Sequence, residues 1–207
     1  MRYLHFLLSP GHSGSIFGHY LTPGKRSPQI PPGIYEGEYN RELVKEIIRN
    51  VDLRSDLPAI QVDNLVPGPC RVPLSTRVKT VNQVAKYHNV VLLDVHVNAH
   101  GNGRSGWTDA DGYTLFYSNK NAFKTRSMAL ADTLDRCLDL DAGSLGIRRR
   151  GVKKKPFYML KNPKAPSVLL EAGFMTNLED VAHLQENLRQ LAAAIVTSLV
   201  TFSKLEF

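Results

Sequence analysis

The chain has 207 residues, of which 43% are hydrophobic and 22% are charged. This is enough for one well-packed domain, too short for two comfortable ones, and it excludes intrinsic disorder as the default state. The formal charge of +7, from 26 basic and 19 acidic residues, favours an anionic partner such as nucleic acid, a membrane surface or an acidic polymer.

Cysteines and apolar runs give few signals of a cellular compartment. Cys70 and Cys137 are too few for a disulfide framework, and we expect both to be buried thiols. The apolar stretch at residues 1–8 is too short for a secretory leader, so no signal peptide is visible in this chain. No apolar run approaches the ~20 residues of a membrane helix, and we expect no stable membrane insertion.

The first half of the chain alternates between strand and helix patterns. Residues 3–8 predict a strand that runs into Ser-Pro-Gly-His at 9–12. Glycine and proline fill residues 11–33, which predicts a long irregular loop, and loops of that length are usually functional or disordered. Further elements follow in order: a helix at 38–50, a strand at 58–62 and a helix at 75–88 with Ser75 as its N-cap.

The second half continues the alternation. Residues 90–95 lack polar alternation, which is typical of a strand buried on both faces. A glycine-rich loop at 101–106 follows, then strands at 112–117, 156–160 and 166–171 and helices at 119–138, 178–185 and 186–204. The whole pattern predicts an α/β fold: a three-layer α/β/α sandwich around a mostly parallel, mixed sheet of about six strands.

Three ionisable residues share one structural position in this prediction. His12 follows the first strand, His96 follows the strand at 90–95, and Glu171 ends the strand at 166–171. Ligands bind at the carboxyl ends of strands in open α/β sheets, so these side chains should gather at one rim. Two imidazoles near carboxylates suit zinc, which needs a third protein ligand; the candidates are Glu36 and Glu38.

Several segments occur in an informative order. They are Ser-Pro-Gly-His at 9–12, residues 36–43, residues 75–82 with Arg77 and Asn82, Val-His-Val-Asn-Ala at 95–99, Arg-Gly-Val at 150–152, and Pro-Ser-Val-Leu-Leu-Glu-Ala-Gly-Phe at 166–174. Together they resemble the zinc-dependent N-acetylmuramoyl-L-alanine amidases of the type 3 catalytic family. The resemblance runs in order from residue 3 to about residue 200 and covers nearly the whole chain.

The resemblance implies a fold, a cofactor and a reaction. Residues 1–207 would form a single amidase catalytic domain with a zinc-exopeptidase- or amidase-like fold. Bound Zn²⁺ would support hydrolysis of the amide between N-acetylmuramic acid and L-alanine in peptidoglycan. His12 and His96 become metal ligands and Glu171 the catalytic carboxylate that transfers protons. For the third ligand the family pattern favours Glu36, with Glu38 as the alternative.

Other residues are candidates for contact with substrate, and one motif departs from the family. Asn98 and His100 follow His96, and Arg150 lies among the six cations at 148–150 and 153–155, so these three are expected substrate contacts. The family usually has Asp where this chain has Ser9. That change removes no ligand, although it takes away a carboxylate that would help to orient the loop.

Two alternatives stay open beside the amidase. One is a zinc peptidase that cleaves another peptidoglycan amide, and the other is a non-catalytic wall-binding module, against which Glu171 and both histidines argue. Charge alone suggests nucleic acid, but no aromatic-basic motif supports it, so we expect no nucleic-acid partner. We expect a monomer with an open site that acts at the cell wall, exported, periplasmic or phage-delivered, as an autolysin or endolysin.

Overall fold

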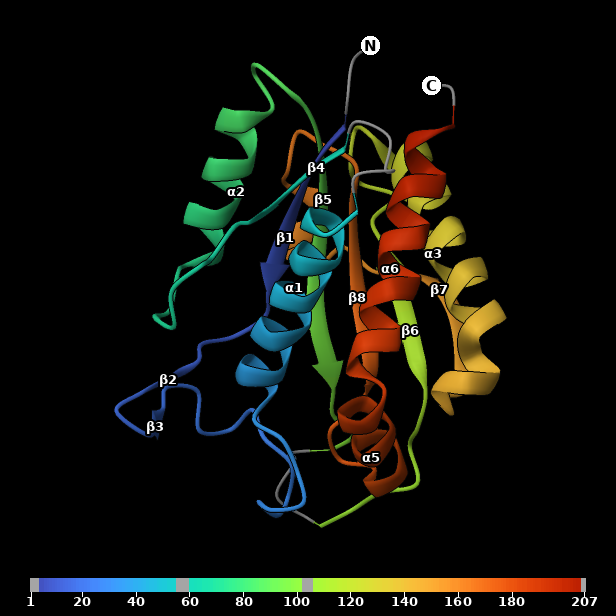
Figure 1. Cartoon of the computed structure of the whole chain (residues 1–207). Helices are drawn as coiled ribbons and strands as arrows, with labels where there is room; N and C mark the ends of the chain where they lie inside the picture. The colour runs from blue at the N-terminus through green and yellow to red at the C-terminus, as the bar shows by residue number, and fades with distance from the viewer. Residues whose placement is uncertain (1–3, 55–59, 102–105, 206–207) are drawn as a thin grey trace.

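A computed structural model describes residues 4–54, 60–101 and 106–205. Its centre is a six-stranded sheet in the order β4-β1-β5-β8-β6-β7 (Figure 1). In that order the strands are Ile60–Asn64, Leu4–Pro10, Asn89–Asn98, Ser167–Phe174, Tyr113–Tyr117 and Arg149–Lys154. The first four run parallel to one another, whereas β6 is antiparallel to β8 and parallel to β7. This mixed, mostly parallel sheet confirms the predicted fold class.

Helices cover both faces of the sheet and complete the three layers. On one face α6 packs against both α1 and α3, and on the other α2 packs against the short α4 (Figure 1). The helices are α1 Glu36–Asp52, α2 Leu74–Val84, α3 Lys124–Leu145, α4 Tyr158–Lys161, α5 Leu178–Glu186 and α6 Leu188–Ser203. Among the residues described, no helix has the length and apolar character needed to cross a membrane.

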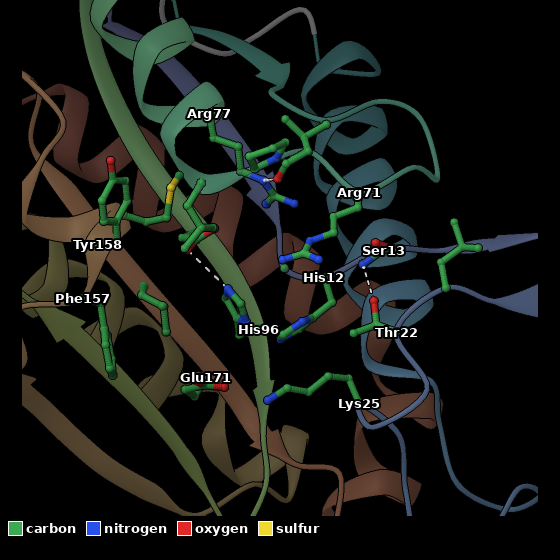
Figure 2. Close-up of a pocket in the computed structure, with 18 residues that line it drawn as sticks. His12, Ser13, Thr22, Lys25, Arg71, Arg77, His96, Phe157, Tyr158 and Glu171 are labelled. Atoms are coloured by element: carbon green, nitrogen blue, oxygen red, sulfur yellow. Dashed lines mark hydrogen bonds and ion pairs between the residues drawn. The ribbon is translucent and has the colours of Figure 1, made fainter.

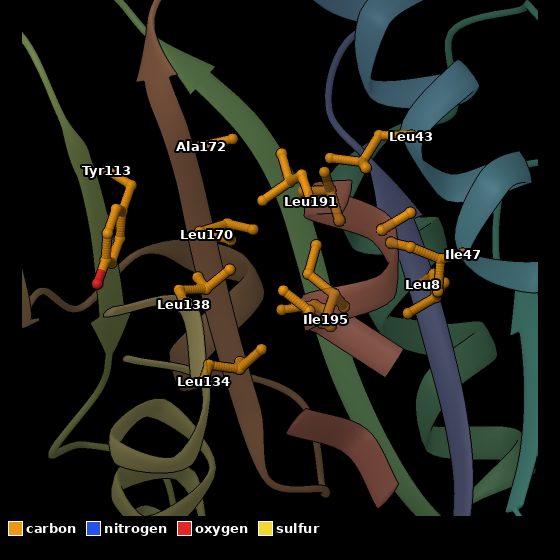
Figure 3. Close-up of a cluster of buried hydrophobic side chains, with 14 of the residues drawn as sticks. Leu8, Leu43, Ile47, Tyr113, Leu134, Leu138, Leu170, Ala172, Leu191 and Ile195 are labelled. Atoms are coloured by element: carbon orange, nitrogen blue, oxygen red, sulfur yellow. The ribbon is translucent and has the colours of Figure 1, made fainter. Parts of the chain in front are cut away.

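The central strands are apolar at successive positions because neighbouring side chains along a strand point to opposite faces of the sheet, and helices cover both faces. Along β5, Leu93 joins the large core beneath α1, α3 and α6, whereas Leu92 joins the smaller cluster beneath α2. A strand with one apolar layer on each face needs apolar residues at every position. Figure 3 shows the larger core, in which Leu8 and Leu170 from the sheet face Ile47 and Ile195 from the helices.

Several predicted elements are wrong in position or type. The strand expected at 156–160 is instead the helix α4 at Tyr158–Lys161. The preceding strand β7, at Arg149–Lys154, shows no strand pattern in the sequence, where it is only part of a run of cations. It lies at the sheet edge, where charged residues protect the exposed backbone from pairing with another chain, so it carries little of the apolar pattern that identifies a strand.

Smaller differences concern element boundaries and the cysteines. Helix α1 begins at Glu36 rather than residue 38, and α3 spans Lys124–Leu145 rather than 119–138. Helix α2 begins at Leu74 with Pro73 as its N-cap, so Ser75 is not the cap. Cys70 is exposed and Cys137 half-buried, so the expectation of two buried thiols is wrong. The starts of the first and second predicted strands and most of the 101–106 loop lie outside the described residues.

Candidate active site

Neighbouring parallel strands deliver the predicted residues to one rim of the sheet. The chain turns immediately after β1 and presents His12, while β5 carries His96 and β8 carries Glu171. His96 and Glu171 are register partners on adjacent strands, so their backbones are neighbours. The rings of His12 and His96 meet edge to face with centroids 5.3 Å apart. The rim predicted from strand order therefore exists, and its three residues gather there.

Helix α1 brings Glu36 to both histidines. Its Oε1 lies 3.0 Å from His96 Nδ1, and its Oε2 lies 3.3 Å from His12 Nε2. One ligand atom from each of these three residues falls within 4.8 Å of the other two. Glu38 points elsewhere and accepts a hydrogen bond from the Ser15 hydroxyl. The geometry thus places Glu36, and not Glu38, beside the histidines.

Two glycines allow these backbones to approach so closely. A Cβ on Gly11 would overlap the imidazole of His96, and a Cβ on Gly37 would overlap the carbonyl oxygen of Ser13. His12 has a positive φ of 59°, an uncommon conformation for a residue other than glycine. Such conformations persist where surrounding contacts impose them, and they concentrate at functional sites.

Two further α1 residues, which the sequence did not single out as functional, hold the His12 loop. Arg41 Nη1 donates to the His12 carbonyl at 3.0 Å, and Asn40 Nδ2 donates to the Gly11 carbonyl at 3.3 Å. Glu36 and Asn40 are four residues apart and so share one helix face. The same spacing, a glutamate followed four residues later by an asparagine, is the part of the family pattern that favoured Glu36 as the third ligand.

The buried carboxylates at the rim have opposite electrostatic environments. Burial alone would raise the pKa of Glu36, but His12 and His96 lower it to about 2. Burial raises the pKa of Glu171 to about 8, with His96 opposing the rise and Glu36 adding to it. Burial works to lower the pKa of His96, yet the Asp94 carboxylate raises it well above 6.5. One carboxylate is thereby kept ionised and the other is poised to exchange a proton near neutrality.

The donor set fits a zinc ion. Two imidazoles and one carboxylate match the three-ligand arrangement of catalytic zinc sites. Among the described residues, the buried Glu36 Oε2 makes no hydrogen bond although His12 Nε2 lies 3.3 Å away, and the buried Glu171 Oε2 has no hydrogen-bond partner. Buried polar atoms are normally satisfied, and each exception needs an explanation. A cation between His12, Glu36 and His96 would explain the first, and a water beside Glu171 would explain the second.

A cleft of about 600 Å³ opens over these residues (Figure 2). His12, His96 and Glu171 line its floor, with Lys25 and Arg71 on one side and the aromatic pair Phe157 and Tyr158 of the α4 segment on the other. The sequence had offered no role for these wall residues, which lie in irregular segments or in the segment wrongly predicted as a strand.

The three predicted substrate contacts lie outside this cleft lining. Asn98 Oδ1 accepts from the Ala99 amide at 2.8 Å, and the amide of the exposed His100 donates to Thr176 Oγ1 at 3.0 Å. Arg150 lies over the Phe174 ring, 5.2 Å from its centroid, and donates to the Asp111 carbonyl at 2.8 Å. If these residues contact substrate, they do so beyond the immediate surroundings of the histidines.

The fold and rim define a class before any relative is considered. An α/β/α domain that brings two histidines near strand ends together with a glutamate from a helix start, beside a buried carboxyl of raised pKa, has the donor set of a metallohydrolase. Comparison with known families narrows the class. Residues 7–201 match the family described as N-acetylmuramoyl-L-alanine amidase, type 3, and the chain belongs to this family.

Individual relatives agree with this assignment. The chain is 29% identical over 170 residues to the N-acetylmuramoyl-L-alanine amidase LytC of Bacillus subtilis, covering 81% of this chain and 31% of LytC. It spans 50% and 56% of two further curated relatives.

Solved structures share the fold over nearly the full length of both chains. An N-acetylmuramoyl-L-alanine amidase of Clostridium difficile 630 is 25% identical with a TM-score of 0.74, covering 97% of this chain and 96% of the other. The amidase AmiC2 of Nostoc punctiforme is 23% identical with a TM-score of 0.74, covering 96% of each chain.

Proposed function

We propose that residues 1–207 form a single amidase catalytic domain that hydrolyses the amide between N-acetylmuramic acid and L-alanine in peptidoglycan, with Zn²⁺ as cofactor. The observation that carries the proposal is the convergence of Glu36 on both histidines, with Glu171 as the register partner of His96. Family membership over residues 7–201 supports the choice of bond. The proposed ligands are His12, Glu36 and His96.

The metal ligands and Glu171 have different roles in the proposed hydrolysis. His12, Glu36 and His96 would hold a zinc ion, which would act as a Lewis acid on the scissile carbonyl and would lower the pKa of water towards ~7. Glu171 accepts a proton from the attacking water and returns it to the nitrogen of the departing L-alanine. Its burial favours this role, because a carboxyl with a pKa of about 8 binds and releases protons near neutral pH. Glu171 is thus the proton carrier rather than a ligand.

The cleft walls suit the two parts of the substrate. The exposed ring faces of Phe157 and Tyr158 offer apolar surface to a sugar or lactyl group. Lys25 and Arg71 offer positive charge to the carboxylates of a stem peptide. The net charge of +7 favours approach to an anionic wall polymer. Such a substrate requires action at the cell wall, after export or phage delivery, and the proposal includes a monomer.

The test uses zinc-loaded protein and purified peptidoglycan. New amino termini are labelled and identified after digestion. The proposal expects L-alanine amino termini to appear with time, and it expects none to form when a zinc chelator is present from the start. New termini on another residue would indicate a peptidase that cleaves a different amide. Wall binding without any new terminus would indicate a non-catalytic module, and either result would contradict the proposal.

A further inference from the structure

A buried aspartate lies on the far side of the His96 imidazole from Glu36. Asp94 precedes His96 by two residues on β5, so both side chains project from the same face of the strand. Asp94 Oδ2 is 3.3 Å from His96 Nε2, while Glu36 Oε1 is 3.0 Å from His96 Nδ1. Each ring nitrogen therefore faces its own carboxylate, and the ring is held between them.

Within the described ranges, the only hydrogen bond of the Asp94 carboxylate is the one with His96. Asp94 is only 2% exposed, and its Oδ1 has no hydrogen-bond partner among the described residues. The buried Arg77 lies close enough to supply opposite charge. Its guanidinium nevertheless donates to Ser9 Oγ at 2.9 Å and to the Pro10 carbonyl at 2.7 Å. Across the residues described, the hydrogen bond of the Asp94 side chain goes to His96.

The backbone around Asp94 is fixed on both sides. In the sheet register Asp94 is opposite Ser9 of β1 and Leu169 of β8, and His96 is opposite Glu171. A side chain set on a paired central strand holds its partner more accurately than one set on a loop. The aspartate is thus a rigid support for a ring that the described structure aims at Glu36.

We infer that Asp94 is a positioning residue of the metal centre, accepting a hydrogen bond from His96 Nε2–H so that Nδ1 faces the ion beside Glu36. A carboxylate behind a ligating histidine fixes the tautomer and orientation of the ring and raises its basicity. Loss of such a partner typically costs about 10- to 100-fold in metal affinity. The inference rests on the metal centre of the proposed function and adds a residue that the sequence did not identify.

Zinc affinity of the full chain, measured by competition with a chromophoric chelator, tests this role. Asp94→Ala removes the acceptor and should weaken zinc binding about 10- to 100-fold. Asp94→Asn keeps an acceptor of the same size without the charge and should lose less. Asp135→Asn is the matched control, because Asp135 is an equally buried carboxylate that pairs with Arg149 away from the rim. The control should bind zinc as the unaltered protein does.

Nuclear magnetic resonance of ¹⁵N-histidine protein loaded with zinc gives a second readout, independent of activity. His96 should bind the metal through Nδ1 and carry a proton on Nε2. That proton should shift in Asp94→Asn and exchange rapidly in Asp94→Ala. If Asp94→Ala does not fold, the Asn variant alone decides, since an unchanged Nε2–H signal and unchanged zinc affinity would overturn the inference.

Other outcomes separate this inference from the proposed function. Metal bound through Nε2, with zinc lost from Asp94→Asn as completely as from His96→Ala, would make Asp94 a ligand and overturn the positioning role. Zinc binding that depends on Asp94 in a protein that leaves peptidoglycan intact would contradict the proposed reaction alone. If the protein cleaves peptidoglycan but its zinc affinity is unchanged when Asp94 is substituted, that result would contradict the inference alone. Failure of the protein to bind zinc would contradict both.

Discussion

Two regions of the molecule concentrate charge, and they use it differently. At the rim, Glu36 and Glu171 are largely buried and each has an oxygen without a hydrogen-bond partner among the described residues. Along β7 and the residue before it, the cations are exposed or half-buried and the first two already have partners. Arg148 pairs with Asp111, and Arg149 pairs with Asp135. Carboxylate oxygens at the rim are thus still available to bind a ligand, whereas the first two cations at β7 are already paired with carboxylates of the same domain.

This comparison shows that the density of charge in a sequence is a poor guide to a site. Surface ion pairs stabilise little, and exposed cations are readily solvated. Buried groups that converge without mutual satisfaction are costly unless a ligand satisfies them. Substitutions at the rim should therefore change chemistry or metal binding, and substitutions at β7 should have small effects.

The largest effect is expected for Glu171→Gln. The amide keeps the shape of the side chain but cannot accept and return a proton, so kcat should fall about 10²- to 10⁴-fold. Zinc content should stay at the level of the unaltered protein, because Glu171 is not among the proposed ligands. Turnover assays with metal analysis measure both quantities. Full turnover in this variant would remove Glu171 from the mechanism.

The pair Glu36→Gln and Glu38→Gln forms a matched comparison on one helix turn. Glu36 faces both histidines and is a proposed ligand. Loss of a residue that only supports a ligand costs roughly 10- to 100-fold in metal affinity, so Glu36→Gln should weaken zinc binding by at least that factor. Glu38 accepts from Ser15 instead, and its change should leave zinc affinity nearly unaltered. Chelator competition gives both affinities. Equal losses, or a larger loss for Glu38, would contradict the proposed ligand set.

Gly11→Ala tests how tightly the rim is packed. The added methyl would overlap the His96 ring, so the ring or the loop must move, at a cost of about 1–3 kcal/mol in the free energy of unfolding. Zinc affinity should fall as well. Gly24→Ala is the control, because a Cβ there meets no atom within 4 Å. Thermal denaturation with and without zinc measures both effects, and a Gly11→Ala protein as stable as the control would disprove the close approach.

The pH dependence of turnover should show how burial and neighbouring charges set the pKa of Glu171. The carboxylate must be unprotonated to accept a proton, so activity should rise with pH through its pKa. Burial raises that pKa and the charge of Lys25 lowers it. Lys25→Met should therefore raise the pKa and move the acidic limb of the kcat profile to higher pH. Lys153→Met, which removes an exposed cation from β7, should leave the limb in place. A shift to lower pH for Lys25→Met would contradict this electrostatic account.

The smallest effect is expected for Arg150→Ala. Arg150 lies over Phe174 and outside the lining of the cleft. Turnover of a short muramyl peptide should stay nearly unchanged, while KM for intact peptidoglycan should rise modestly and more at low salt, where charge contributes most. Comparison of the two substrates measures this. A large loss of kcat on the short substrate would place Arg150 at the reacting bond and break the contrast between the two regions.

The sequence predicted the rim because its signals are local. A mostly apolar run such as 90–95, in which Asp94 is the one polar residue, identifies a central strand, and parallel strands deliver His12, His96 and Glu171 to the same end of a sheet. Strand β7 escaped prediction because an edge strand can be charged, whereas residues 156–160 form a short apolar run that cannot be assigned to strand or helix by its pattern alone. Edge strands depend on their partners more than on their own composition.

The remaining parts of the site depend on contacts between distant segments. Glu36 and Glu38 both lie in the first turn of α1, and the family resemblance favoured Glu36 but left Glu38 open as the alternative. The choice follows from the packing of Gly37 on Ser13 and from the hydrogen bond between the Gly37 amide and the Tyr20 hydroxyl. The sequence gives no sign of a role for Asp94, because that role depends on the position of the His96 ring beside it.

The most direct test of the central claim is an anomalous difference map at the zinc absorption edge from crystals of zinc-loaded protein. The account predicts one strong peak between His12, Glu36 and His96, with ligand distances of about 2.0–2.2 Å. It also predicts that Glu171 lies near the peak without coordinating it. A map with the zinc elsewhere, or with no zinc between these three residues, would contradict the account.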